Sequence, residues 1–251
     1  LPGGCAIGTR PIDLHLTNLE KMGAKITVER GYVYAESEGR LKGAHLVLAF
    51  PSVGATENLM MAATLAEGTT IIENAALEPE IDDLANFLNA MGAKVTGIGT
   101  KKIQIEGVKE LNEVDYTAIG DRIEAATYIM AALATKSKVK VTDFDPHHLE
   151  FVLDELKNMG AKLNIGENFV EVLPSDLKSC KVDTAPFPGF PTDVQAQMMA
   201  LVTQVKGSSI ITEHIFENRF MHVPELNRLG ASIELKGNTA FVEGESKLKG
   251  A

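Results

Sequence analysis

The sequence predicts an α/β protein built from a unit of roughly 70 residues that occurs four times. Two observations carry this prediction. A seven-residue motif that ends a helical pattern recurs four times along the chain. Each copy is followed by a stretch in which apolar and polar residues alternate, as they do in a half-buried β-strand. A period of this length is too long for a common solenoid and is typical of pseudo-symmetric copies packed around a shared core.

The repeated motif marks the end of a helix in each unit. Its four copies occupy residues 19–25, 88–94, 156–162 and 226–232. In the second copy, the preceding apolar residues follow the i, i+3, i+4, i+7 spacing of an amphipathic helix. A glycine directly after such a pattern is typical of the left-handed residue that caps a helix C-terminus. The predicted capping residues are Gly23, Gly92, Gly160 and Gly230.

A second helix and a short strand precede the motif in three of the four units. We expect these helices over residues 55–67, 122–136 and 193–206. The strands after them are expected over residues 69–72, 138–142 and 208–212, with hairpins over 26–36 and 233–243 and an apolar strand over 45–50. The apolar faces of the second helices carry methionines that we interpret as core residues: Met60, Met61, Met130, Met198 and Met199.

Two domains are expected, because a polar stretch at residues 109–113 leads to a break near residues 117–120 that divides the repeats two and two. The predicted domains are residues 1–119 and residues 120–251. The chain begins at Leu1 rather than at a methionine, and its last four residues repeat residues 41–44. We therefore expect a fragment that lacks both chain ends.

Composition and charge argue against several classes of function. The 251 residues carry a formal net charge of −10 at pH 7, whereas general nucleic-acid binding requires a basic face. No apolar run approaches the roughly 18 residues of a membrane span, and no signal-peptide pattern is present. The two cysteines, Cys5 and Cys180, lie in different settings and do not suggest a disulfide framework. A reducing cytoplasm is the expected compartment.

The first eleven residues form a glycine-rich stretch that contains a cysteine. Cys5 stands among three glycines, and Arg10 follows five residues later. A thiol on an exposed loop near a cation can do chemistry, whereas a thiol in a packed core is inert. A glycine-rich turn with an incidental cysteine explains the stretch equally well, so the rest of the chain must decide between the two.

Two predicted helix starts carry polar residues that suit either a structural or a binding role. Ser52 lies within residues 51–54, and Asp193 ends the corresponding stretch at residues 190–193. Both residue types are preferred N-caps. The free N–H groups at a helix start also bind phosphate, so the same positions could hold a diphosphate.

Other polar stretches have structural explanations. Residues 216–225 alternate charge with apolar bulk, as a solvated helix face with an internal ion pair does. Asp121 and Asp145 suit helix starts, and the Asp and His residues at 143–148 lack convincing metal-ligand spacing. Residues 97–101 superficially match a phosphate loop but lie where other units have a hairpin turn. No metal site is predicted.

Three motifs taken together resemble one family. They are residues 1–11 with the cysteine and Arg10-Pro11, residues 190–197, and residues 216–222. Over essentially its whole length the chain is similar to the UDP-N-acetylglucosamine 1-carboxyvinyltransferases, which are enolpyruvyl transferases. This resemblance implies a two-domain, pseudo-symmetric inside-out α/β barrel built from βαβαββ units.

The resemblance also implies an activity. Family members transfer the enolpyruvyl group of phosphoenolpyruvate to the 3-hydroxyl of UDP-N-acetylglucosamine and release phosphate, in the first committed step of peptidoglycan synthesis. Fosfomycin alkylates their loop cysteine. No metal, organic cofactor, nucleic acid or membrane partner is implied. Family residues that hold phosphoenolpyruvate lie outside this sequence, so the fragment alone is expected to be inactive.

The resemblance assigns roles to individual residues. Cys5 would donate a proton to the methylene carbon of phosphoenolpyruvate, whose charge Arg10 would neutralise. Asp193 would contact the sugar and take the proton from its hydroxyl, with Arg219 as a supporting cation and Ile215 packed on the nucleotide-sugar. The uridine and diphosphate would be bound by Arg10, Pro11, Ile12, Asp13, Leu14, Ser52, Val53 and Gly54.

Two alternatives stay open. The sister enzymes that transfer enolpyruvyl to shikimate 3-phosphate share the fold, although the cysteine followed by Arg10-Pro11 argues against them. A non-catalytic ring or scaffold would require a basic inner face, and 24 Lys and Arg against 34 Asp and Glu argue against that.

The chain departs from some family members at Phe50, where they carry a lysine of the diphosphate loop.

Overall fold

The four predicted helix ends share one local structure. In the computed structural model, which describes residues 12–216 and 218–250, the four capping glycines have φ values between 97° and 107°. In each copy the glycine N–H donates to the carbonyl three residues before it, and the following alanine N–H donates to the carbonyl five residues before it, at 2.8–3.0 Å. This Schellman motif satisfies carbonyls that a helix end leaves unpaired. The capping prediction is confirmed for Gly23, Gly92, Gly160 and Gly230.

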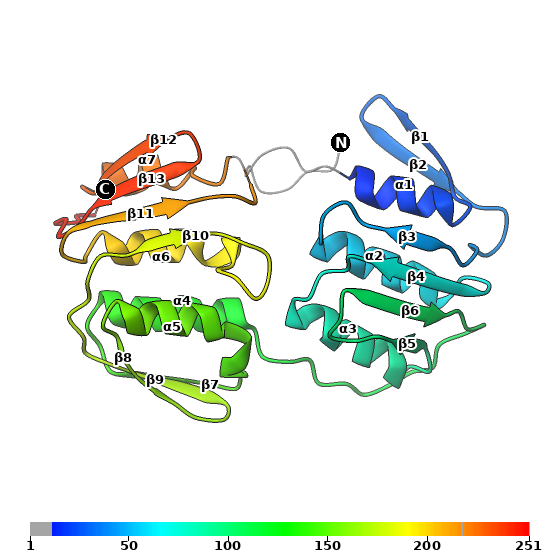
Figure 1. Ribbon diagram of the computed structural model, residues 1–251, viewed down its shortest axis with the longest axis horizontal. Coiled ribbons are helices and arrows are strands. Elements are labelled where there is room, and N and C mark those ends of the chain that lie inside the picture. Colours follow the sequence, from blue (N-terminus) through cyan, green and yellow to red (C-terminus); the bar gives the residue numbers. More distant parts are fainter. Residues whose placement is uncertain (1–11, 217, 251) are drawn as a thin grey trace. The chain divides into compact units, whose positions relative to one another are not determined.

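The described residues divide into two compact units, 12–118 and 119–250, and each has its own core. The first unit runs from blue to blue-green in Figure 1. Its helices are α1 (Asp13–Lys21), α2 (Val53–Thr64) and α3 (Pro79–Ala90). Its strands are β1 (Lys25–Glu29), β2 (Tyr32–Glu36), β3 (His45–Val47), β4 (Thr69–Glu73), β5 (Lys94–Thr96) and β6 (Lys102–Glu106). Strands β1 and β2 form a hairpin, and the other four form a sheet in the order β3-β4-β6-β5.

The second unit repeats this plan from green to red in Figure 1. Its helices are α4 (Arg122–Ala134), α5 (Glu150–Asn158), α6 (Gln195–Val202) and α7 (Val223–Arg228), with 3-10 turns η1 (Pro146–Leu149) and η2 (Thr192–Val194). Its strands are β7 (Val139–Thr142), β8 (Lys162–Ile165), β9 (Phe169–Leu173), β10 (Lys181–Asp183), β11 (Ser208–Thr212), β12 (Ser232–Lys236) and β13 (Thr239–Glu243). They form two sheets, in the orders β7-β9-β8 and β10-β11-β13-β12.

Each unit contains one complete βαβαββ copy. In the first unit, β3 pairs parallel with β4, while β4 and β5 both pair antiparallel with β6. In the second unit, β10, β11, β12 and β13 pair in the same way. The registers of the two parallel pairs match, so the residues that follow the strands also correspond: Leu48 with Thr184, and Asn74 with Glu213. These residues lie at the carboxyl edges of the two sheets.

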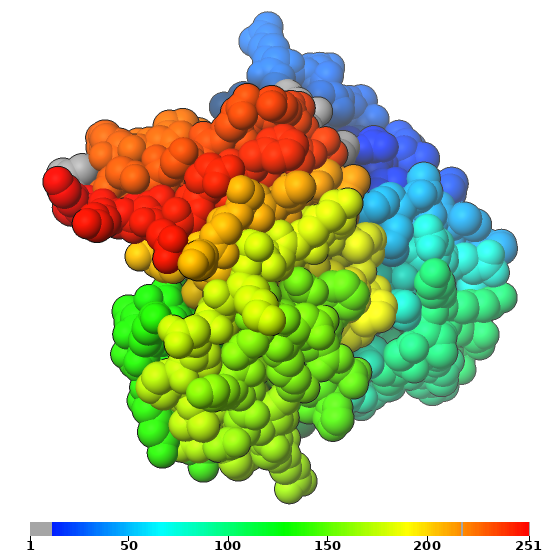
Figure 2. All heavy atoms as spheres, turned by 60° about the vertical axis from the view of Figure 1, so that its left-hand side comes forward, coloured from blue at the N-terminus to red at the C-terminus, as the bar shows by residue number. Residues whose placement is uncertain are grey.

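Apolar side chains of the helices and strands build each core. Figure 2 shows the outer surface of the second unit, which is continuous over these packed elements. Met60 of α2, Met130 of α4, and Met198 and Met199 of α6 are buried, as predicted. The interpretation of Met61 as a core residue is wrong. Its side chain is 48% exposed, because it lies outside the stripe of buried residues that includes Leu59, Met60 and Ala63.

Several elements are shorter than predicted, for reasons visible in the backbone. Helix α2 ends at Thr64, since the N–H of Glu67 leaves the helix and donates to the carbonyl of Leu41 at 2.7 Å. Strand β3 ends at Val47, and a turn closed by the N–H of Ser52 leads into α2. The helix predicted over residues 193–206 is divided into η2 and α6. None of the described helices has the length and apolar character of a membrane span.

Candidate active site

The predicted site residues within the described part of the chain form two groups, one in each unit. Cys5, Arg10 and Pro11 lie outside the described residues. In each complete repeat, predicted residues lie beyond the carboxyl ends of the parallel strands, at the start of the following helix. This is the edge at which open α/β sheets bind ligands.

The group in the first unit lies where α1 begins beside α2. Residues 12–14 form the start of α1. His15 follows them, and its Nδ1 atom is 2.9 Å from Nδ2 of Asn58 in α2. A Cβ atom on Gly54 would lie 3.8 Å from the His15 ring. The contact through His15 therefore brings residues 12–14 close to the predicted anion-binding stretch at residues 52–54.

The start of α2 offers backbone N–H groups to an anion. Ser52 is the N-cap, and its Oγ accepts a hydrogen bond from the N–H of Ala55 at 3.3 Å. Within the described part of the chain, the N–H groups of Val53 and Gly54 donate to no other group. The first turn carries no acidic side chain. Ser52 therefore caps the helix, while the positive end of the helix dipole stays open to a phosphate.

A cavity of about 690 Å³ opens between α1 and the β1–β2 hairpin, and Asn58 of α2 also lines it. It is lined by Ile12, His15, Leu16, Leu19, Arg30, Gly31, Tyr32, Val33 and Asn58. Burial lowers the pKa of His15, and the nearby carboxylate of Asp13 opposes this only in part. The cavity thus combines an apolar wall with a neutral imidazole, an amide and the arginine side chain of Arg30, and the predicted residue Ile12 lines it.

The group in the second unit centres on Asp193. This residue lies within η2, and its Oδ1 atom accepts a hydrogen bond from Arg219 at 2.7 Å. The Asp193 side chain is 53% exposed and the Arg219 side chain 21%. The capping role considered for Asp193 is absent, because the 3-10 turn places the residue inside the turn and its carboxylate pairs with Arg219.

Residues 216–225 are not the helix face that their charge pattern indicated. The described residues 218–222 form turns, and α7 begins only at Val223, with Pro224 in its first turn. The guanidinium of Arg219 lies 5.5 Å from the ring centroid of Phe216. The described residues 218–222 therefore form a loop, not a helix, and this loop brings Arg219 to Asp193, 26 residues earlier in the sequence.

Behind the Asp193–Arg219 pair lies a buried carboxylate that the sequence analysis missed. Glu213 follows β11 and is 2% exposed. Its oxygens accept hydrogen bonds from the Thr184 and Thr192 hydroxyls, the Gln195 amide and the N–H groups of Ile215 and Phe216. The network brings the predicted residues Asp193, Ile215 and Arg219 to one edge of the sheet. The sequence signal for Glu213 is its position in the repeat. It stands directly after a strand, where the first unit has another polar residue, Asn74.

Burial shifts the pKa of two further groups in the second unit. It raises the pKa of Cys180 to about 11, since this thiol packs against the core beside β10. Burial and the charge of Arg219 lower the pKa of His222, whose Nε2 atom is 3.2 Å from Sδ of Met199. Cys180 is therefore protonated and unreactive at neutral pH, and His222 is favoured in its neutral form.

Asp121, Asp145 and residues 97–101 have the structural roles that the sequence predicted for them. Asp121 accepts hydrogen bonds from two N–H groups as the N-cap of α4, and Asp145 caps η1. Residues 97–101 connect β5 to β6 as a hairpin turn. Among the described residues, no three His, Cys, Asp or Glu side chains are grouped so that they could hold a metal ion.

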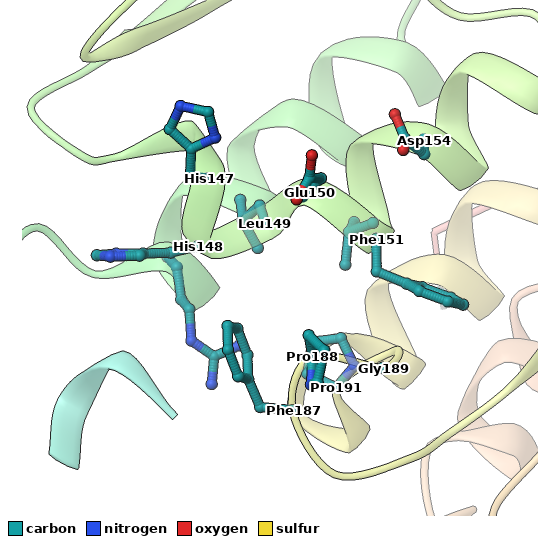
Figure 3. A pocket seen from close by; sticks show the side chains of 12 residues that line it. His147, His148, Leu149, Glu150, Phe151, Asp154, Phe187, Pro188, Gly189 and Pro191 are labelled. Atoms are coloured by element: carbon teal, nitrogen blue, oxygen red, sulfur yellow. The ribbon is translucent and has the colours of Figure 1, made fainter. Parts of the chain in front are cut away.

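Another cavity, of about 410 Å³, lies in the second unit (Figure 3). The η1–α5 segment lines one side of it, and the loop of Phe187, Pro188, Gly189 and Pro191 lines the other. The guanidinium of Arg122 lies 5.6 Å from the centroid of the Phe187 ring. None of the predicted site residues lines this cavity.

Comparison with known proteins gives consistent matches. A family model described as EPSP synthase (3-phosphoshikimate 1-carboxyvinyltransferase) matches residues 1–251. The UDP-N-acetylglucosamine 1-carboxyvinyltransferases of Shewanella woodyi and Pseudoalteromonas atlantica are each 55% identical to the chain over 253 residues. These matches cover 100% of this chain and 60% of each relative. The chain thus spans about three-fifths of the length of the curated relatives it matches.

Solved structures show the same fold. The enolpyruvyl transferase NikO from Streptomyces tendae matches with a TM-score of 0.84 and 24% identity, over 96% of this chain and 60% of that one. EPSP synthase from Acinetobacter baumannii matches with a TM-score of 0.68 and 21% identity, over 98% of this chain and 59% of that one. The predicted fold class and the resemblance drawn from the three motifs are confirmed.

Proposed function

Because the chain belongs to the EPSP synthase (3-phosphoshikimate 1-carboxyvinyltransferase) family, we propose that the protein containing it transfers enolpyruvyl from phosphoenolpyruvate to the 3-hydroxyl of UDP-N-acetylglucosamine. The observation that carries this proposal is 55% identity over the whole chain to curated relatives of that name. The step would commit the nucleotide-sugar to peptidoglycan synthesis. The cytoplasm is the proposed compartment, because the two cysteines of the chain do not suggest the disulfide framework of an oxidising compartment.

The first unit would bind the nucleotide. Residues 12–14, with Arg10 and Pro11, would hold the uridine end of the nucleotide-sugar, and the open N–H groups of Val53 and Gly54 would bind the diphosphate. Ser52 would contribute by capping α2 in the orientation that aims these groups at the phosphates. Phe50, which is 44% exposed, supplies no charge here, so the backbone carries the anion binding.

The second unit would act on the sugar hydroxyl. Asp193 is half exposed at the carboxyl edge of the sheet, and one of its oxygens is held by Arg219. The other oxygen would be the base that takes the proton from the hydroxyl. Ile215, fixed by its N–H bond to Glu213 at 2.8 Å, would pack on the nucleotide-sugar.

The reaction would be an addition followed by an elimination. Cys5 would protonate the methylene carbon of phosphoenolpyruvate, and the sugar oxygen would add to the neighbouring carbon as Asp193 takes its proton. The C–O bond to phosphate then breaks, with its electron pair leaving on the phosphate. The methyl carbon would return a proton to the Cys5 thiolate, which restores both the double bond and the thiol. Thiols are mostly protonated at neutral pH, so Cys5 is suited to act as an acid. The same thiol is the proposed target of fosfomycin.

An acceptor comparison tests this proposal against the sister activity. The complete protein that contains this chain should release phosphate from phosphoenolpyruvate when UDP-N-acetylglucosamine is added. It should release none when shikimate 3-phosphate or buffer replaces the nucleotide-sugar. Release with shikimate 3-phosphate instead would assign the protein to the sister activity.

A further inference from the structure

We propose that Glu213 is a positioning residue that holds the Arg219–Asp193 pair in place through the hydroxyl of Thr192. Its catalytic consequence rests on the proposed function, whereas its effect on the Arg219–Asp193 contact does not. The Glu213 side chain is buried, and no Lys, Arg or His side chain pairs with it in the described part of the chain. Hydrogen bonds alone therefore compensate for burying this carboxylate.

The fold itself does not require a carboxylate at this position. The corresponding residue of the first unit is Asn74, whose Nδ2 atom donates to the carbonyl of Leu48 at 2.9 Å. In the second unit Thr184 takes the place of Leu48, and its hydroxyl donates to Oε1 of Glu213 at 2.8 Å. Both arrangements join the ends of the parallel strands. The carboxylate has in addition a second oxygen that reaches Thr192.

The two oxygens of Glu213 have different tasks. Oε1 accepts from the N–H groups of Ile215 and Phe216 at 2.8 and 3.2 Å, so it anchors the loop that follows β11. Oε2 accepts from the Thr192 hydroxyl at 2.9 Å and from Nε2 of Gln195 at 3.4 Å. The second oxygen therefore faces the 3-10 turn that carries Asp193.

The carboxylate sets the direction of the Thr192 hydroxyl. An ionised carboxylate can only accept, so the hydroxyl donates its single proton to Glu213. The Thr192 oxygen then keeps a lone pair for Nη1 of Arg219, which lies 3.1 Å away. Nη2 of the same guanidinium donates to Asp193. Gln195 supports this arrangement, because its Nε2 atom also donates to the carbonyl of Arg219 at 3.2 Å.

Glu213→Gln separates the two tasks. The donors gathered at Oε1 require an acceptor, so the glutamine carbonyl takes that place and its NH₂ group replaces Oε2. This amide group would face the Nε2 donor of Gln195, and it would donate to Thr192 instead of accepting from it. If Gln195 turned its own oxygen toward the new amide, it would lose its bond to the carbonyl of Arg219. The loop stays anchored, while the support of Arg219 is disturbed.

The test compares Glu213→Gln, Thr192→Val and Thr192→Ser in the complete protein that contains this chain. Glu243→Gln is the matched control, since Glu243 is an exposed glutamate on β13 of the same sheet and its carboxylate accepts from the Ser208 hydroxyl. Crystal structures measure the Arg219–Asp193 distance, and phosphate release measures kcat and KM. We expect Glu213→Gln and Thr192→Val to break the contact and lower kcat by about 10- to 100-fold, the scale of a misplaced catalytic group. The KM for the nucleotide-sugar should change less than about twofold. Thr192→Ser keeps the hydroxyl, so it should retain the contact and the kcat of the wild-type protein.

Each result decides the proposal. An intact Arg219–Asp193 contact in Glu213→Gln, or a kcat equal to that of Glu243→Gln, would overturn it. If Glu213→Gln does not fold, Thr192→Val breaks the same link while leaving Glu213 in place. An intact Arg219–Asp193 contact in Thr192→Val would also overturn the proposal. A wild-type protein that releases no phosphate would refute the proposed function, whereas the measured distance would still decide the positioning role.

Discussion

Replacing Asp193 by asparagine should slow turnover far more than it destabilises the fold. Asparagine keeps the size of the side chain and accepts from Arg219, but it cannot take a proton from a sugar hydroxyl. The ion pair is half exposed on the Asp193 side, and such pairs contribute about 0–1 kcal/mol to stability. Loss of a positioned base slows a reaction by about 10²–10⁴, which is about 2.7–5.5 kcal/mol of activation free energy.

The two effects are measured on one sample of the complete protein that contains this chain. Thermal unfolding gives the stability, nucleotide-sugar binding gives the affinity, and phosphate release gives kcat. Asp183→Asn is the matched control, because Asp183 also pairs with a basic side chain, His214 at 3.2 Å, and is 48% exposed. It should leave kcat nearly unchanged. Near-normal turnover of Asp193→Asn, or an equal loss in Asp183→Asn, would refute the role of Asp193 as the base.

Fosfomycin should label Cys5 and spare Cys180, because a thiol with a pKa of about 11 is ionised in only about one molecule in 10⁴ at pH 7. Peptide mapping that finds the adduct on Cys180 would contradict this. The lowered pKa of His222 means that the unfolded chain binds more protons than the folded one, so stability should fall as the pH drops below about 6.5. His222→Gln should flatten this slope in denaturant titrations between pH 5 and 7, and an unchanged slope would refute the assignment. Gly23→Ala should cost about 1–2 kcal/mol of unfolding free energy, since its φ of 97° strains any side chain although the space around it is open. Gly250→Ala is the control, with open space and no positive φ, and equal costs at both positions would contradict the argument.

Much of the fold could be predicted from the sequence, because it is encoded locally. The capping glycines, the helical spacing before them and the hairpin turns act within a few residues, and the structure confirms them. The errors arose where distant residues decide. Helix α2 ends early because Glu67 bonds to Leu41, and Met61 is exposed because of the face on which it lies.

The candidate site was predicted only where a motif carries it. Ser52 acts as the cap that its residue type indicates. Asp193 does not, since Arg219 approaches from a distant loop and binds its carboxylate. The local sequence does not point to Glu213, because a single glutamate after a strand has no local pattern. Its partner Thr184 reaches it through the pairing of β10 with β11, and Thr192 and Gln195 reach it from η2 and α6.

The mass of the nucleotide-sugar product tests the central claim most directly. The complete protein that contains this chain would be incubated with phosphoenolpyruvate and UDP-N-acetylglucosamine, and the products would be measured by mass spectrometry. The proposed reaction predicts that the nucleotide-sugar gains the mass of one pyruvic acid minus one water, with one phosphate released for each molecule formed. Phosphate release while the mass of UDP-N-acetylglucosamine stays unchanged would contradict it.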